Sequence, residues 1–126
     1  MAVIKSINHI AVVVDNMEKA LAFWSDALGI ELHELRDVPA EKSQVAFLPL
    51  AGAEVELVMP TSDDSGIAKY LAKRGPGMHH LCLEVDDIDG MLAHLKQKKI
   101  RLINEEARTA ADGKKYAFIH PESTGG

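Results

Sequence analysis

The chain has little of what marks several common classes of protein. Its one cysteine, Cys82, excludes an intramolecular disulfide framework and fits a reducing compartment. Its longest apolar run, IAVVV, is too short to span a membrane, and no signal-peptide pattern precedes it. The formal net charge is −5 and no basic stripe is present, so we expect no nucleic-acid partner. What remains is a chain of 126 residues, long enough for one domain with one core.

One pattern of residues occurs twice along the chain, 71 positions apart. The segments INHIAVVVDNMEKAL (7–21) and MHHLCLEVDDIDGML (78–92) each carry a histidine, an apolar run and then Val-Asp. The same shift places AFL (46–48) on AFI (117–119). A register kept over this much of the chain indicates duplication of a whole structural unit.

The first copy predicts the element order β-α-β-β-β. Strand 7–14 is followed by a capping box of Asp15 and Glu18, and the predicted helix ends at Gly29. Its apolar face is predicted to hold Met17, Leu21, Trp24 and Leu28. Three further strands are predicted at 30–35, 43–50 and 53–59.

The second copy repeats this order without its last strand. Asp86 and Asp89 are predicted to open its helix, and strands are predicted at 100–104 and 114–120. We therefore predict an α+β fold, a single domain over 1–126 in which two paired βαβββ modules form a curved mixed sheet. The first module spans 1–59, a linker with a short helix spans 60–77, and the second, C-terminally incomplete module spans 78–126.

Three side chains are candidate metal ligands because of the face on which they lie. Side chains alternate between the faces of a strand, so the apolar sets of the repeated strands turn His9 and His80 to the opposite face. The same alternation in AEVELVM turns Glu56 to that face. Two imidazoles and a carboxylate suit a divalent metal ion with open coordination positions, so we predict a metal cleft between the modules. By the repeat, a fourth ligand is expected near position 127, on a strand beyond Gly126.

The whole chain resembles the vicinal-oxygen-chelate superfamily, which includes glyoxalase I, extradiol dioxygenases and bleomycin-resistance proteins. Within it, the chain is similar to the methylmalonyl-CoA epimerase family. The segments that carry the resemblance are INHIAVVV, AEVELVMPTSDDSGIAKYLAKRG, GMHHLCLEVDDID and YAFIHPESTGG. The resemblance implies His9, Glu56 and His80 as metal ligands, and it places a catalytic Glu beyond Gly126. Some family members have a second base where this chain has Val45.

The resemblance also implies a reaction, a cofactor and partners. The reaction is the interconversion of (R)- and (S)-methylmalonyl-CoA through a metal-stabilised enolate. The cofactor is one divalent ion, Co²⁺ by preference, with Zn²⁺, Ni²⁺ or Mn²⁺ as alternatives. An acyl-CoA substrate and a homodimer are implied, in bacterial cytoplasm or the mitochondrial matrix, with no membrane partner. Lys114 and Tyr116, on one face of the strand 114–120, are candidate substrate-binding residues.

Other functions on the same scaffold stay open at this stage. A lactoylglutathione lyase would use similar ligands and related enediolate chemistry. An extradiol dioxygenase would need redox-active iron and access for O₂. A drug-sequestering protein of the bleomycin-resistance type would need no metal, so the predicted ligand set argues against it.

Overall fold

A computed structural model describes residues 2–126, which form two compact units. The larger unit, Ser6–Leu83, contains most of one sheet and the helices α1 and α2. The smaller unit joins residues 2–5 to 84–126 and contains the helix α3. The two candidate histidines and Glu56 all belong to the larger unit.

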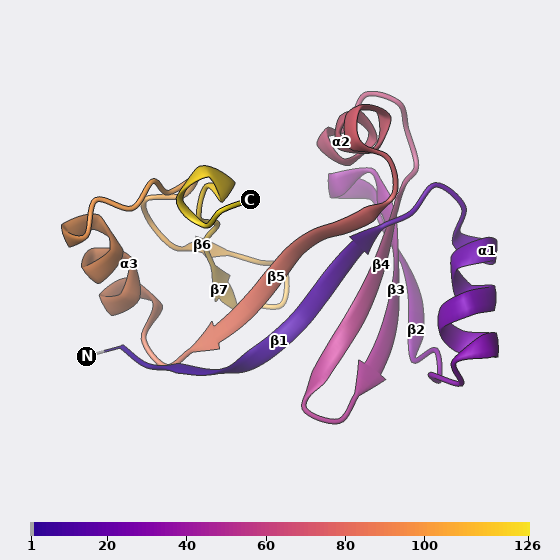
Figure 1. The fold of residues 1–126 in the computed structure, drawn as a ribbon, viewed down its shortest axis with the longest axis horizontal. Coiled ribbons are helices and arrows are strands. Elements are labelled where there is room, and N and C mark those ends of the chain that lie inside the picture. The colour runs from indigo at the N-terminus through magenta and orange to yellow at the C-terminus, as the bar shows by residue number, and fades with distance from the viewer. Residues whose placement is uncertain (1) are drawn as a thin grey trace. The chain divides into compact units, whose positions relative to one another are not determined.

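A curved five-stranded sheet has the strand order β2-β3-β4-β1-β5 (Figure 1). Its strands are β1 (Ile4–Val13), β2 (Glu34–Val38), β3 (Ser43–Leu50), β4 (Ala53–Pro60) and β5 (Gly77–Val85). The strand β1 runs parallel to β4, whereas the β2–β3 and β3–β4 pairs are antiparallel. This arrangement confirms the predicted α+β class and the mixed, curved sheet.

The pairing of β1 with β4 fixes which side chains share a face. Ile10 lies opposite Val55, and Val12 lies opposite Leu57. Val55 and Leu57 belong to the buried core, and Val12 packs against it. Ala11 lies opposite Glu56, so Glu56 faces away from that core, as the alternation of side chains predicts.

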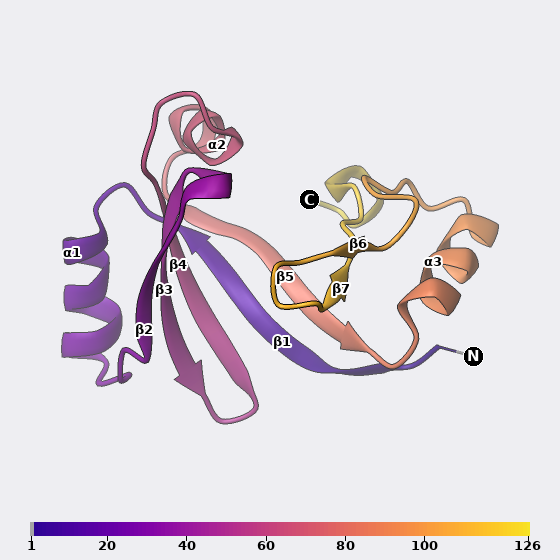
Figure 2. The ribbon, with the colours of Figure 1, turned by 180° about the vertical axis from the view of Figure 1, so that it is seen from behind.

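The helix after β1 covers the core face of the sheet but differs from its prediction. The α-helix α1 (Met17–Leu21) continues as a π-helical segment over Ala22–Ala27 and lies beside β2, β3 and β4 (Figure 2). Met17 and Trp24 pack into the core, as predicted. Leu28 is 53% exposed, because a π-helical turn holds an extra residue and rotates the following side chains off the apolar face. The helical segment ends at Ala27, and Gly29 follows its cap with a φ of +80° that favours glycine.

Both predicted helix starts are wrong by one residue. Asn16, not Asp15, caps α1, and its side-chain oxygen accepts from the Lys19 amide at 3.0 Å. Asp87, not Asp86, caps α3, and accepts from the Gly90 amide at 3.0 Å. A cap needs an extended residue just before the first helical turn, and the following position has that conformation in both cases.

The segment between β4 and β5 holds the short helix that the linker pattern predicts. This helix, α2 (Gly66–Arg74), begins after Ser65, whose hydroxyl oxygen accepts from the Ala68 amide at 3.0 Å. Its ribbon follows β4 and precedes β5 in Figure 1. Over residues 2–126, no helix is both long enough and apolar enough to cross a membrane.

The smaller unit has less strand structure than predicted. It holds α3 (Ile88–Gln97) and the short strands β6 (Arg108–Thr109) and β7 (Lys115–Tyr116), which pair with each other. The predicted strand 100–104 is reduced to a single bridge between Leu102 and Ile119. The predicted strand 114–120 is likewise reduced to β7 and that bridge, so the strand predictions for this unit are wrong in length.

Candidate metal centre

Three neighbouring strands supply the three candidate ligands. The central strand β1 carries His9, β4 on one side carries Glu56, and β5 on the other carries His80. On β4 the residue opposite His9 is Glu54, so Glu56 lies diagonally from His9, about 7–8 Å away between strands, a distance that long side chains can span. The sheet order therefore brings residues from positions 9, 56 and 80 together.

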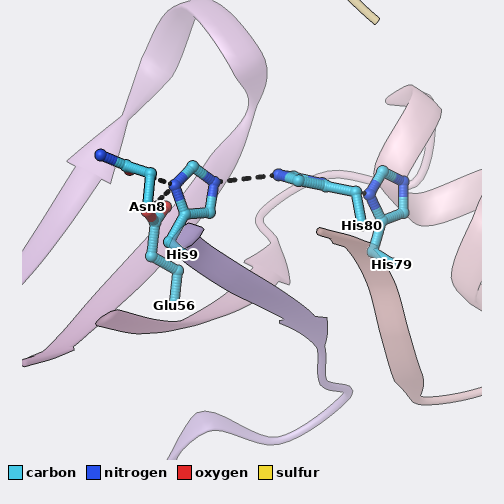
Figure 3. Close-up of polar contacts among 5 residues, drawn as sticks. All are labelled: Asn8, His9, Glu56, His79 and His80. Carbon is cyan, nitrogen blue, oxygen red and sulfur yellow. Dashed lines mark hydrogen bonds and ion pairs between the residues drawn. The ribbon is translucent and has the colours of Figure 1, made fainter. Parts of the chain in front are cut away.

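The His9 imidazole contacts both other candidates through its two nitrogens (Figure 3). Its Nε2 lies 3.1 Å from Nε2 of His80, and the two rings meet edge to face at 76°. Its Nδ1 lies 3.1 Å from Oε2 of Glu56. The three groups thus form a chain with His9 in the middle, and they do not surround one point.

Two further side chains contact this chain of groups and were missed by the sequence analysis. Asn8 Oδ1 lies 2.7 Å from Nδ1 of His9, and Nδ1 of His79 lies 2.8 Å from Nδ1 of His80 (Figure 3). Both residues directly precede a predicted ligand. Strand alternation points consecutive side chains to opposite faces, so it does not predict contacts between neighbours in the sequence. The His-His pair at 79–80 was the only available signal.

Burial keeps both candidate imidazoles uncharged at neutral pH. Desolvation lowers the pKa of His9 below its ordinary value of 6.5. Desolvation, with the nearby His9 and His79, lowers the pKa of His80 to about 4. A neutral imidazole offers a nitrogen lone pair, which is the form that binds a metal ion.

The pKa of Glu56 is shifted in the opposite direction, upward. Its burial, reinforced by the charge of Glu54, raises its pKa to about 7, against a smaller lowering by Arg36. Only 18% of the Glu56 side chain is exposed. Because the lowered pKa of His9 favours a neutral ring near pH 7, the 3.1 Å approach of Nδ1 to Oε2 is not a full ion pair.

The donor set fits a divalent cation, although the three groups do not converge on one. Two nitrogens bound side by side to one ion at about 2.0–2.1 Å stand about 3 Å apart, close to the observed 3.1 Å. Glu56 faces the other nitrogen of His9, so its carboxylate has to rotate to join them. Among residues 2–126, no group of three or more His, Cys, Asp or Glu side chains is arranged to hold a metal ion. The structure therefore does not show the predicted metal cleft among the described residues.

The remaining candidate residues lie at defined positions within their own units. Val45 is buried in β3, opposite Arg36 on one side and Val58 on the other, and it carries no titratable group. Lys114 and Tyr116 belong to the smaller unit and both are exposed. The Tyr116 ring meets the Phe118 ring edge to face, with 6.0 Å between centroids.

Comparisons with known proteins agree with the fold. The family model described as Glyoxalase/Bleomycin resistance protein/Dioxygenase superfamily matches residues 8–118. The mitochondrial methylmalonyl-CoA epimerase of Bos taurus is 44% identical over 121 residues, covering 95% of this chain and 69% of the relative. The crystal structure of methylmalonyl-CoA epimerase from Mycobacterium tuberculosis has a TM-score of 0.83 at 31% identity, covering 97% of this chain and 83% of that one.

A further solved structure, of a methylmalonyl-CoA epimerase in complex with methylmalonyl-CoA and NH₄⁺, has a TM-score of 0.85 at 26% identity. The match covers 98% of this chain and 90% of that chain.

Proposed function

We propose that this protein interconverts (R)- and (S)-methylmalonyl-CoA. The chain belongs to the Glyoxalase/Bleomycin resistance protein/Dioxygenase superfamily and, within it, to the methylmalonyl-CoA epimerases. The reaction removes the proton between the thioester and the carboxylate and returns it on the other face. The observation that carries the proposal is the juxtaposition of two neutral imidazoles, 3.1 Å apart at Nε2, with a carboxyl group against one of them.

The chemistry of the reaction explains why this donor set is needed. Loss of the α-proton places negative charge on the thioester oxygen, so the site must stabilise that charge. A divalent cation held by His9, His80 and Glu56 would supply Lewis-acid polarisation of that oxygen when bound. In its ionised form Glu56 would add a carboxylate oxygen to the two imidazole nitrogens that would hold the ion. Val45, an apolar side chain, cannot serve as a second base.

The finer expectations follow from the family and are part of this proposal. The cation is Co²⁺ by preference, or Zn²⁺, Ni²⁺ or Mn²⁺, because imidazole and carboxylate ligands suit all four. Lys114 and Tyr116 contact the acyl-CoA. The chain acts as a homodimer, in bacterial cytoplasm or the mitochondrial matrix.

The direct test follows the α-proton. The full chain is treated with a chelator, reloaded separately with each of the four metals, and incubated with (S)-methylmalonyl-CoA in D₂O. We expect deuterium to enter the α-position, with formation of the (R) epimer, both followed by NMR. His9→Ala and His80→Ala should each lower the rate by at least about 100-fold, the usual cost of losing stabilisation of a developing oxyanion. His33→Ala, at an exposed position on the same unit, is the matched control and should keep the wild-type rate.

Absence of exchange with all four metals would refute the proposal. Isomerisation of the hemithioacetal of methylglyoxal and glutathione, without exchange into methylmalonyl-CoA, would instead identify a lactoylglutathione lyase.

A further inference from the structure

An arginine lies on the same face of the sheet as Glu56. Arg36 belongs to β2, where it lies opposite Val45 of β3. In the neighbouring row of the sheet, Glu34 lies opposite Phe47, and Phe47 lies opposite Glu56. This row faces away from α1, because the residues that flank Phe47 and Glu56 along β3 and β4 form the buried core on the other face. Both rows belong to the larger unit.

Two neighbours hold the guanidinium group of Arg36 in place. Its Nε donates to Oε2 of Glu34 at 2.7 Å, and its Nη2 donates to Oε1 of Glu34 at 2.8 Å. Its Cζ lies 4.7 Å from the centre of the Phe47 ring. A bidentate carboxylate and an aromatic ring together fix the plane of a guanidinium group. The positive charge is therefore held above Phe47, the strand neighbour of Glu56, before any ligand binds.

The charges on this face are mostly negative. Among the described strand residues of the larger unit, the face carries three carboxyl groups, Glu34, Glu54 and Glu56, and one side chain with a permanent positive charge, Arg36. Burial and the charge of Glu54 raise the pKa of Glu56, whereas the charge of Arg36 lowers it, so that charge acts at the candidate site. The Arg36 side chain is 54% exposed, so a ligand can reach it. An anionic ligand on this face would be repelled by the carboxylates, and Arg36 is the group that offsets this repulsion.

We propose that Arg36 binds the free carboxylate of methylmalonyl-CoA and so selects acyl-CoA esters that carry a carboxylate on the α-carbon. The inference rests on the proposed function for the identity of this ester. The carboxylate is bonded to the carbon that reacts, whereas the pantetheine arm separates the phosphates of CoA from the thioester. A cation above the strand neighbour of Glu56 therefore suits the carboxylate better than the phosphates. The planar guanidinium also matches a carboxylate in its geometry.

The test compares two esters that differ only in this carboxylate, racemic methylmalonyl-CoA and propionyl-CoA. Their dissociation constants for the full chain are measured by isothermal titration calorimetry, with a chelator present so that no metal ion contributes to binding of the carboxylate. Arg36→Gln removes the positive charge, and Arg36→Lys keeps the charge without the planar group. Arg101→Gln is the matched control, because Arg101 forms the same kind of exposed ion pair with Glu122 in the smaller unit.

We expect the wild type to bind methylmalonyl-CoA at least about 10-fold more tightly than propionyl-CoA, the usual order for a hydrogen bond between charged groups. Arg36→Gln should abolish this preference by weakening the binding of methylmalonyl-CoA alone. Arg36→Lys should keep part of the preference, and Arg101→Gln should keep all of it. Unchanged binding of propionyl-CoA by Arg36→Gln would show that this variant is folded.

Three results would overturn the inference. An equal loss of affinity for both esters in Arg36→Gln would place Arg36 on a phosphate of CoA. An unchanged preference in that variant would leave Arg36 as an exposed partner of Glu34 only, and a wild type that does not distinguish the esters would show that no carboxylate is recognised. Exchange of the α-proton is followed separately with the metal-loaded wild type, and its absence beside an intact preference would refute the proposed function without touching the role of Arg36.

Discussion

Replacement of Glu56 by Gln should stabilise the metal-free protein, and the gain should depend on pH. Glu56 carries a pKa of about 7 in the folded protein against an ordinary value of 4.5. The folded state therefore binds the proton more tightly than the unfolded state does. The stabilising contribution of the protonated carboxyl is complete below about pH 4.5, and it is lost as the pH rises through 7.

The size of the effect follows from the shift. A difference of one pKa unit corresponds to 1.36 kcal/mol, so a shift from 4.5 to about 7 corresponds to about 3 kcal/mol. Glutamine stays neutral at every pH and avoids this cost of ionisation. We therefore expect Glu56→Gln to raise the free energy of unfolding by up to about 3 kcal/mol at pH 8 and by close to zero at pH 4.5.

The assay is urea denaturation at both pH values in the presence of a chelator. The chain has one tryptophan, and Trp24 packs against the core of the larger unit, so its fluorescence reports the unfolding of that unit. The lowered pKa of His80 also makes the free energy of unfolding fall as the pH drops from 6.5 through about 4. This contribution is the same in the wild type and in Glu56→Gln, so it cancels in their difference.

A control of opposite sign lies on the same sheet. The Arg36 guanidinium donates a hydrogen bond to the Glu34 carboxylate and lowers its pKa. Glu34→Gln should therefore slightly lower the free energy of unfolding at pH 8 and should not raise it. If Glu56→Gln changed the free energy of unfolding by the same amount at pH 4.5 and pH 8, the reasoning would be refuted. Such a result would show that the Glu56 carboxyl is not desolvated in the folded protein.

The remaining predictions concern helix caps and buried side chains, and urea denaturation at pH 7 checks each of them. Asn16→Ala should cost about 1 kcal/mol because it removes the cap of α1, whereas Asp15→Ala, one position earlier, should cost close to nothing. The two buried serines should respond with opposite signs. Ser43→Ala should stabilise by about 1 kcal/mol, because its buried hydroxyl has no hydrogen-bond partner among the described residues, and Ser65→Ala should destabilise by about 1 kcal/mol, because it caps α2. Leu57→Ala, at a fully buried position, should cost about 2–5 kcal/mol, and a loss below 1 kcal/mol would contradict the assignment of the core.

The sequence predicted β3 and β4 well because their alternation is strong and local, whereas β2 forms at Glu34–Val38 and the predicted strand 30–35 is wrong in position. The strand β3 has the predicted bounds, and β4 extends one residue beyond its prediction. Alternation in these strands correctly separated the core residues from the face that carries Glu56. The π-helical turn could not be predicted, because no residue at Ala22–Ala27 marks it and its effect is seen only in the exposure of Leu28.

The smaller unit was predicted less well for a different reason. A short apolar pattern such as IRLIN (100–104) resembles a strand, but a strand forms only where a neighbour pairs with it along its length. In the structure only Leu102 finds such a partner, in Ile119. Periodicity reports which side chains suit a strand and does not report which pairings form.

The order of strands explains why the two histidines and Glu56 form a chain of contacts. The repeat predicted that His9 and His80 share a face, and β1 and β5 are neighbours, so their Nε2 atoms meet. Glu56 lies on β4, the neighbour on the opposite side of β1, and therefore reaches His9 at Nδ1. If Glu56 joined His9 and His80 in holding a cation, Asn8 would be the remaining partner of Nδ1 of His9. Asn8→Leu should therefore weaken Zn²⁺ binding about 10–100-fold, as loss of a ligand's second partner usually does, and undiminished binding would show that Glu56 keeps its place on Nδ1.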